Sequence, residues 1–281
     1  MTKIVFFDID GTLLDKKRRI PASAKLAILE LKKQGIIPAI ATGRPPFLIK
    51  EILEELAIDT HISLNGQYVV HKGEIVYQNP MEAHLVERLA QAAEINKQGI
   101  AFAGSETIAG NSLTTTGSRK WQKKLSRILP FSPPTFLINA AFKRSDKIHG
   151  NRPVLKEYYE NRLIYQCMLH ATEEHDAYYS QEFPDCSFMR WNPYSVDVCP
   201  NNGSKAVGIT KLMQFLEFPI EASVAFGDGL NDQEMLKIVG TGVAMENGRE
   251  ELKAIADYIT DKPEDDGILN GYGYLRLLSR V

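Results

Sequence analysis

The sequence contains few cysteines and no long hydrophobic run. Its 281 residues include three cysteines, Cys167, Cys186 and Cys199, which are far apart and form no CxxC pair. A sparse, odd set of this kind favours reduced thiols over a disulfide framework. No stretch approaches the ~18 apolar residues of a membrane span, and acidic residues directly after the short apolar start do not fit a signal peptide. We therefore expect a cytoplasmic protein.

The chain also lacks a strong charge of either sign. Its 33 lysines and arginines nearly balance 35 aspartates and glutamates, for a net charge of −2. Without a basic field, neither nucleic acid nor a membrane is an expected partner. There is no Walker-type GxxxxGK[ST] loop and no internal repeat. The length is sufficient for two domains, and we expect a monomer or a weak homodimer that acts on a small molecule.

Strand and helix patterns alternate at both ends of the chain. Apolar runs at 4–7, 36–41 and 223–226 are typical of strands buried on both faces. A helix pattern at 21–34 begins with a proline and ends before Gly35. The alternation predicts an α/β fold, with a Rossmann-like parallel sheet core, helices on both faces and right-handed crossovers.

The middle of the chain has a different character. It contains a helix pattern at 83–97 and strand-like segments at 163–170 and 187–190, with no phosphate loop and no metal-ligand spacing. The strand–helix alternation returns with Ser195–Cys199, which we interpret as a strand of the core. These patterns predict a discontinuous core domain and an inserted α+β domain, with boundaries at 1–81 and 191–281 for the core and 82–190 for the insertion.

Polar residues follow three of the predicted buried strands. Asp8 and Asp10 lie two residues apart at the exit of the first strand, so they point to the same face. Thr42 and Gly43 follow the second strand, and the segment from Asp228 to Asp232 follows the third. Because ligands bind at the carboxyl ends of parallel strands, these clusters form one site if the strands are neighbours.

Such a collection of carboxylates requires a counter-charge. Like charges at close range repel unless a cation or a shared proton relieves them. Mg²⁺ suits a site with few protein oxygens, because water and phosphate oxygens complete its coordination. Thr42, Gly43 and Lys205 supply the donors that a phosphate dianion needs. A carboxylate can act as the nucleophile in phosphoryl transfer, and we assign that role to Asp8 and proton transfer to Asp10.

Together these residues closely resemble the four motifs of the haloacid-dehalogenase-like phosphatases, in particular the Cof-type (subfamily IIB) sugar-phosphate phosphatases. The motifs occur in order as Asp8-x-Asp10-Gly11-Thr12, Thr42-Gly43-Arg44, Lys205 and Gly227-Asp228-Gly229-Leu230-Asn231-Asp232. Two later segments, 242–248 and 265–267, also resemble that subfamily. Two positions depart from its usual residues, Ala206 and Gly248, and neither is expected to touch a catalytic group.

The resemblance implies a role for each motif residue. It implies that Asp8 attacks phosphorus, that Asp10 is the general acid/base, and that Mg²⁺ is bound by Asp8, Asp228 and the backbone carbonyl of Asp10. Asp232 is implied to orient Lys205 or a metal-bound water. The implied phosphate-binding groups are the backbone N–H groups of Ile9 and Gly43 with Thr42, Lys205 and Asn231. The residues that could line the cleft are Arg44, Asn65 and Gly66.

Several of these residues also have plain structural interpretations. Lys205 could be a surface charge at a helix start, and Asn231 and Asp232 could simply cap a helix. Arg44 could be a surface residue, and Asn65-Gly66 a turn.

The insertion matches the cap domain that the resemblance implies between the second motif and Lys205. Only about 30 residues separate Asp10 from Thr42, which is the length of one βαβ unit and leaves no room for a cap there. The expected function is Mg²⁺-dependent hydrolysis of small phosphorylated metabolites, such as sugar phosphates, through an aspartyl-phosphate. Two alternatives remain, phosphoryl transfer to a sugar acceptor and a non-catalytic regulator that binds phosphorylated metabolites.

Overall fold

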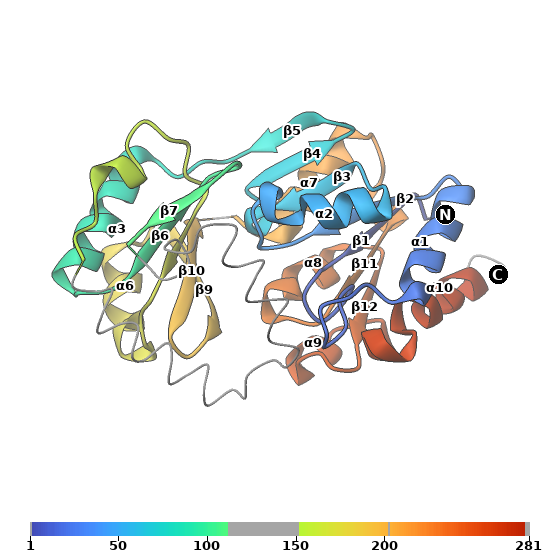
Figure 1. The fold of residues 1–281 in the computed structure, drawn as a ribbon. Coiled ribbons are helices and arrows are strands. Elements are labelled where there is room, and N and C mark those ends of the chain that lie inside the picture. The colour runs from blue at the N-terminus through green and yellow to red at the C-terminus, as the bar shows by residue number, and fades with distance from the viewer. Residues whose placement is uncertain (1, 112–151, 202, 279–281) are drawn as a thin grey trace. The chain divides into compact units, whose positions relative to one another are not determined.

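The computed structural model describes residues 2–111, 152–201 and 203–278, which belong to two compact units. The larger unit comprises Met1–Gln78 and Gly203–Val281, and the smaller comprises Asn79–Asn202. Figure 1 shows each unit built around its own sheet. Among the described residues, no helix is both long enough and apolar enough to span a membrane.

Eight strands of the described chain form the sheet of the larger unit. They are β1 (Ile4–Phe7), β2 (Ile37–Ala41), β3 (Thr60–Ser63), β4 (Tyr68–His71), β5 (Glu74–Gln78), β11 (Ser223–Gly227), β12 (Thr241–Met245) and β13 (Tyr258–Thr260). Their order is β13-β12-β11-β1-β2-β3-β4-β5. Pairing is parallel from β13 to β3 and antiparallel from β3 to β5. The predicted α/β fold with a parallel core is confirmed.

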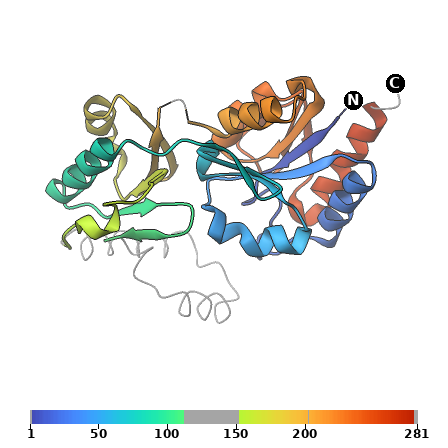
Figure 2. The same ribbon diagram turned by 90° about the horizontal axis from the view of Figure 1, so that it is seen from above.

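Helices cover both faces of this sheet. They are α1 (Ala22–Lys33), α2 (Pro46–Leu56), α7 (Lys205–Phe215), α8 (Gln233–Ile238), α9 (Glu250–Lys253) and α10 (Gly267–Leu278). Strand β1 is buried on both sides, with Val5 and Phe7 packed against α1, α2 and α10, and Ile4 and Phe6 packed against α7, α8 and α9. Figure 2 shows the orange helices α7 and α8 on one side of the sheet and the blue helices α1 and α2 on the other.

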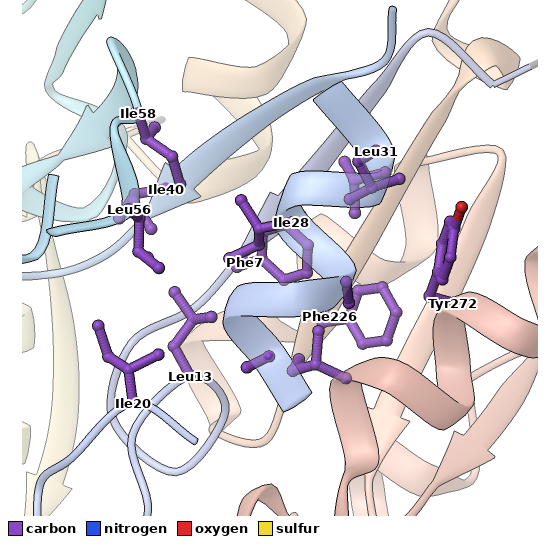
Figure 3. Packing of buried hydrophobic residues seen from close by; sticks show 14 of the residues in the cluster. Phe7, Leu13, Ile20, Ile28, Leu31, Ile40, Leu56, Ile58, Phe226 and Tyr272 are labelled. Atoms are coloured by element: carbon purple, nitrogen blue, oxygen red, sulfur yellow. The ribbon is translucent and has the colours of Figure 1, made fainter. Parts of the chain in front are cut away.

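Aromatic rings occupy the centre of the first of these two cores. Phe7 of β1 stacks on Phe226 of β11, with 5.3 Å between ring centroids, and Ile28 of α1 packs nearby (Figure 3). This packing connects β1 to β11, although their sequences lie more than 200 positions apart. The core therefore fixes the two strands that carry the first and last motifs.

The smaller unit has an antiparallel sheet. In the described part of this unit the strands are β6 (Ile100–Ala103), β7 (Ile108–Gly110), β8 (Gln166–Leu169), β9 (Cys186–Asn192) and β10 (Ser195–Pro200), in the order β7-β6-β8-β10-β9. Helices α3 (Ala83–Ile95) and α6 (Asp176–Glu182) contribute buried side chains to one core with this sheet. The three cysteines are buried free thiols of this unit, and burial raises the pKa of Cys186 to about 11.

The assignment of Ser195–Cys199 to the core domain is wrong. This segment is β10, which pairs antiparallel with β8 and β9 in the smaller sheet. Its alternating pattern is typical of a strand in either sheet, and the long-range partner decides which. The division therefore lies after Asn202 rather than at 190.

Short 3-10 turns connect many of these elements. They are η1 (Leu64–Gly66), η2 (Lys156–Tyr158), η3 (Glu173–His175), η4 (Ile220–Ala222), η5 (Leu230–Asp232) and η6 (Pro263–Asp265). Two of them lie at the carboxyl edge of the parallel sheet: η1 follows β3 directly, and η5 follows β11 after Asp228 and Gly229.

Candidate active site

The three central strands of the large sheet bring the predicted strand-end clusters to one edge. Strand β1 lies between β11 and β2, and both pairs are parallel. Asp8 follows β1, Thr42 follows β2 and Asp228 follows β11. The Asp8 N–H donates to the carbonyl of Phe226 at 3.0 Å, so the β1–β11 pairing continues to the first aspartate. The convergence expected for neighbouring strands is therefore present.

Lys205 lies at the centre of this edge and is completely buried. Its Nζ donates to Asp8 Oδ1 at 2.5 Å and to Asp232 Oδ1 at 2.6 Å. Burial alone would lower the pKa of Lys205, but the carboxylates of Asp232 and Asp8 outweigh it and raise the pKa above its usual value. The lysine is thus a permanent buried cation, which excludes its interpretation as a surface charge.

Asp232 is bound through both of its carboxylate oxygens. Oδ1 accepts from Lys205, while Oδ2 accepts from the backbone N–H groups of Asp228 at 3.0 Å and Gly229 at 2.9 Å. The side chain is fully buried. A Cβ at Gly227 would lie 2.6 Å from Asp232 Cγ, so only glycine leaves room for this arrangement. Asp232 therefore fixes both Lys205 and the loop that carries Asp228.

Asp8, Asp228 and Asp232 form an acidic cluster whose carboxylate oxygens lie within 4.8 Å of one another. Burial raises the pKa of Asp8 to about 8, with Lys205 opposing the shift and Asp232 and Asp228 adding to it. Burial likewise raises the pKa of Asp228 to about 6. Burial, the main cause of both shifts, disfavours the charged form of these carboxyl groups, and a bound divalent cation would stabilise that form. Because Asp232 is already engaged by three donors, Asp8 and Asp228 are the carboxylates that fit a cation best.

Two residues of the first motif, Gly11 and Thr12, position the Asp228 side chain. Thr12 Oγ1 donates to Asp228 Oδ1 at 2.7 Å. Gly11 has a φ of +89°, and a Cβ there would lie 2.2 Å from Asp228 Oδ2. Glycine is therefore required for both the backbone conformation and the close approach. The sequence predicts no role for Thr12, and only its position directly after Gly11 in the first motif points to this contact.

Asp10 lies next to this cluster but has a different partner. Both of its carboxylate oxygens accept from the guanidinium of Arg44, with a distance of 2.7 Å from Nε to Oδ2. The Asp10 side chain is 57% exposed, and that of Arg44 is 28% exposed. This bidentate pair restrains the orientation of the Asp10 carboxylate. Arg44, predicted only as a cleft residue, thus contacts the proposed acid/base directly.

The predicted phosphate-binding residues line the same edge. Thr42 is buried, and its Oγ1 accepts from the Arg44 N–H at 3.2 Å. Asn231 is exposed, and its Nδ2 donates to Asn65 Oδ1 at 3.2 Å. Ile9 is buried, and its carbonyl accepts from the two N–H groups that follow Thr12. Asn65 is also buried, so it belongs to the packed edge of the site.

The segment after β12 supports the site through its backbone. The carbonyl of Asp228 accepts from the Arg249 N–H at 3.1 Å, and Asn247 Nδ2 donates to the carbonyl of Gly11 at 2.9 Å. A Cβ at Gly248 would lie 3.1 Å from Asp228 Cα. The resemblance marks this segment in the sequence, but these contacts are visible only in the structure.

Replacing Lys205 by methionine is expected to destabilise the protein strongly. The substitution leaves Asp8 and Asp232 buried without their cation, which typically costs about 3–5 kcal/mol of the free energy of unfolding. Urea unfolding in chelator measures the loss. Lys211→Met, on the exposed face of the same helix, should change the free energy by less than about 1 kcal/mol. Equal effects of the two variants would contradict the assignment of Lys205 as the central buried cation.

Comparison with known proteins identifies the family. Residues 5–271 match the family of haloacid dehalogenase-like hydrolases. The Bacillus subtilis (strain 168) protein named "Putative phosphatase YkrA" is 38% identical over 277 residues, which cover 99% of each chain. The pyridoxal phosphate phosphatase YbhA of Escherichia coli (strain K12) is 26% identical, and the match covers 95% of this chain and 96% of YbhA.

Solved structures agree with the sequence comparisons. The HAD subclass IIB sugar phosphatase BT4131 superposes with a TM-score of 0.77 at 28% identity, over 98% of this chain and 99% of that one. A crystal structure of a hypothetical protein from Geobacillus kaustophilus HTA426 gives a TM-score of 0.79 at 38% identity, over 99% and 100% of the two chains. The chain therefore belongs to the haloacid dehalogenase-like hydrolases and is a phosphatase of that family.

Proposed function

We propose that this phosphatase hydrolyses small phosphorylated metabolites in a Mg²⁺-dependent reaction with Asp8 as the nucleophile. One observation carries the proposal: Asp8, Asp228 and the buried cation Lys205 meet at the carboxyl ends of adjacent central strands. A structural salt bridge would need only one carboxylate for the lysine. The additional carboxylates, with raised pKa values at Asp8 and Asp228, favour a site for a cation and a phosphate.

The residues suggest a reaction in two steps. In the first, an Asp8 oxygen forms a bond to phosphorus, the ester O–P bond breaks, and Asp10 gives a proton to the leaving alcohol. In the second, water attacks the phosphorus of the aspartyl-phosphate while Asp10 takes its proton. The P–O bond to Asp8 then breaks, which releases inorganic phosphate and restores the carboxylate.

Other residues would hold the phosphoryl group during both steps. Lys205, Thr42 and Asn231 supply cationic and neutral donors, and the N–H groups of Ile9 and Gly43 supply backbone donors. Mg²⁺ would be held by the carboxylates of Asp8 and Asp228 and the carbonyl of Asp10. When bound, it would neutralise part of the charge of the carboxylates and the phosphate. Asp232 would keep Lys205 and the Asp228 loop in place.

The proposed substrate class follows from the family members. Relatives are named as phosphatases of sugar phosphates, of pyridoxal phosphate and of a phosphoribitylaminouracil. All are small organic phosphate monoesters, and we propose a sugar phosphate or a cofactor phosphate for this chain. We further propose a cytoplasmic location and a monomer or weak homodimer.

A panel of phosphate esters with the purified protein tests the proposal. We expect phosphate release at roughly millimolar Mg²⁺. In excess chelator the rate should fall by a factor of about 10² or more. Restored activity after Mg²⁺ is added back excludes irreversible unfolding. Unchanged rates in chelator would contradict the metal requirement.

The same panel separates the two alternatives. With an added sugar acceptor, a phosphotransferase would form a new sugar phosphate instead of inorganic phosphate. A non-catalytic regulator would bind esters in the presence of Mg²⁺ and release no phosphate from any of them. The presence of both Asp8 and Asp10 favours catalysis, because binding alone has no need of an acid/base beside the nucleophile.

A further inference from the structure

We infer that Asn65 is a positioning residue of the active site, which fixes two phosphate-binding groups through contacts with Gly43 and Asn231. This inference rests on the proposed function, because it gives a role to a residue within that same site. Asn65 lies in the turn η1, directly after β3 and next to the end of β2. The residue is only 2% exposed.

The backbone of this turn is left-handed at three successive residues. The φ angles are +54° at Leu64, +52° at Asn65 and +95° at Gly66. Residues with a Cβ rarely adopt this conformation, and asparagine tolerates it better than most. Strained turns of this kind persist only where their surroundings hold them, and they concentrate at functional sites.

Two segments of the proposed site hold the turn. The N–H of Asn65 donates to the carbonyl of Thr42, and the N–H of Leu64 donates to the carbonyl of Arg44, both at 3.1 Å. On the other side, a Cβ at Gly66 would lie 1.9 Å from the carbonyl oxygen of Ser204, the residue before Lys205. The turn therefore packs between the end of β2 and the start of α7.

The Asn65 amide adds a third connection. A Cβ at Gly43 would lie 2.9 Å from Asn65 Oδ1 and 3.0 Å from Nδ2, so the amide lies against the Gly43 backbone. Oδ1 also accepts from Asn231 Nδ2 at 3.2 Å. One buried side chain thus lies against the Gly43 backbone of the second motif and accepts from a side-chain donor of the fourth.

Loss of the Asn65 amide should weaken binding of the phosphoryl group rather than binding of the leaving group. Gly43 and Asn231 would bind oxygens that every phosphate monoester shares. Removing the Asn65 amide frees both groups to move, whatever alcohol is attached. An aspartate at this position keeps the shape of the side chain but adds negative charge close to the phosphate.

Two variants separate the amide from the backbone of the turn. Asn65→Gly keeps the left-handed conformation and removes the amide, whereas Asn65→Asp keeps the size and the acceptor for Asn231. Calorimetry with inorganic phosphate in Mg²⁺ gives Kd directly, and kcat/KM is measured for two esters with different leaving groups. In Asn65→Gly we expect Kd to rise about tenfold and both kcat/KM values to fall by the same factor. Asn65→Asp should weaken phosphate binding further.

A double variant tests whether Asn65 acts through Asn231. If it does, Asn65→Gly weakens phosphate binding by a smaller factor in the Asn231→Ala background than in the wild type, because only the Gly43 contact is then left to lose. Fully additive losses, an unchanged Kd in Asn65→Gly, or a Kd for Asn65→Asp equal to that of the wild type would each overturn the inference. If Asn65→Gly does not fold, the Kd of Asn65→Asp decides. Absence of hydrolysis by the wild type would instead overturn the proposed function.

Discussion

Replacing Asp8 by asparagine should reduce Mg²⁺-dependent phosphate release by about 10³-fold or more, because the substitution removes the nucleophile from the site. The buried Lys205 keeps an oxygen acceptor at Oδ1 of the new side chain, so the fold should be retained. Steady-state release of phosphate from the best ester of the panel measures the effect. Circular dichroism and urea unfolding check the fold.

Asp59→Asn is the matched control for this variant. Asp59 is exposed and precedes β3, at the amino end of the same sheet, so the identical chemical change occurs away from the proposed site. Its turnover should equal that of the wild type within about twofold. An Asp8→Asn protein that folds, binds Mg²⁺ and still turns over more than a trace of substrate would contradict the assignment of the nucleophile.

Replacing Asp10 by asparagine should slow turnover by about 10²–10⁴-fold, because the group that transfers the proton is removed. Metal binding should stay largely intact, because the backbone carbonyl proposed to bind the metal is unchanged. An activated ester makes the two steps visible. With p-nitrophenyl phosphate the leaving phenolate needs no proton, so Asp8 can still be phosphorylated. We expect a burst of at most one equivalent of nitrophenol, followed by slow hydrolysis in stopped-flow absorbance.

The Arg44 contact provides the control for Asp10. Arg44→Gln removes the bidentate partner of the Asp10 carboxylate but keeps the acid/base itself. It should retain continuous turnover without a burst. If Asp10→Asn turned over sugar phosphates at the wild-type rate, the proton-transfer role would be wrong.

Much of the larger unit could be predicted because its signals are local. The doubly buried β1 follows from its continuous apolar run, and the neighbouring strand ends follow from the alternation of strands and helices. Helix α10 could not be predicted in this way, since its three glycines are unfavourable in helices. The structure explains one of them: a Cβ at Gly271 would lie 2.4 Å from the Phe226 ring. Close packing therefore overrides helix propensity there.

The site was predictable in its residues but not in its contacts. Asp8, Thr42, Lys205 and Asp228 stand in recognisable motifs, whereas the pairing of Asp10 with Arg44 and the amide contact of Asn65 depend on how distant segments meet. The same limit explains the incorrect placement of Ser195–Cys199, whose sequence suits either sheet.

We expect every turnover to form a covalent aspartyl-phosphate on Asp8. The most direct test quenches the burst phase of Asp10→Asn in acid and reduces the protein with borohydride, which converts an aspartyl-phosphate to homoserine. Peptide mass mapping then locates the modified residue. We expect modification at position 8, in an amount equal to the nitrophenol burst, and none in chelator. Modification of another residue, or a burst with no residue modified, would contradict the role of Asp8.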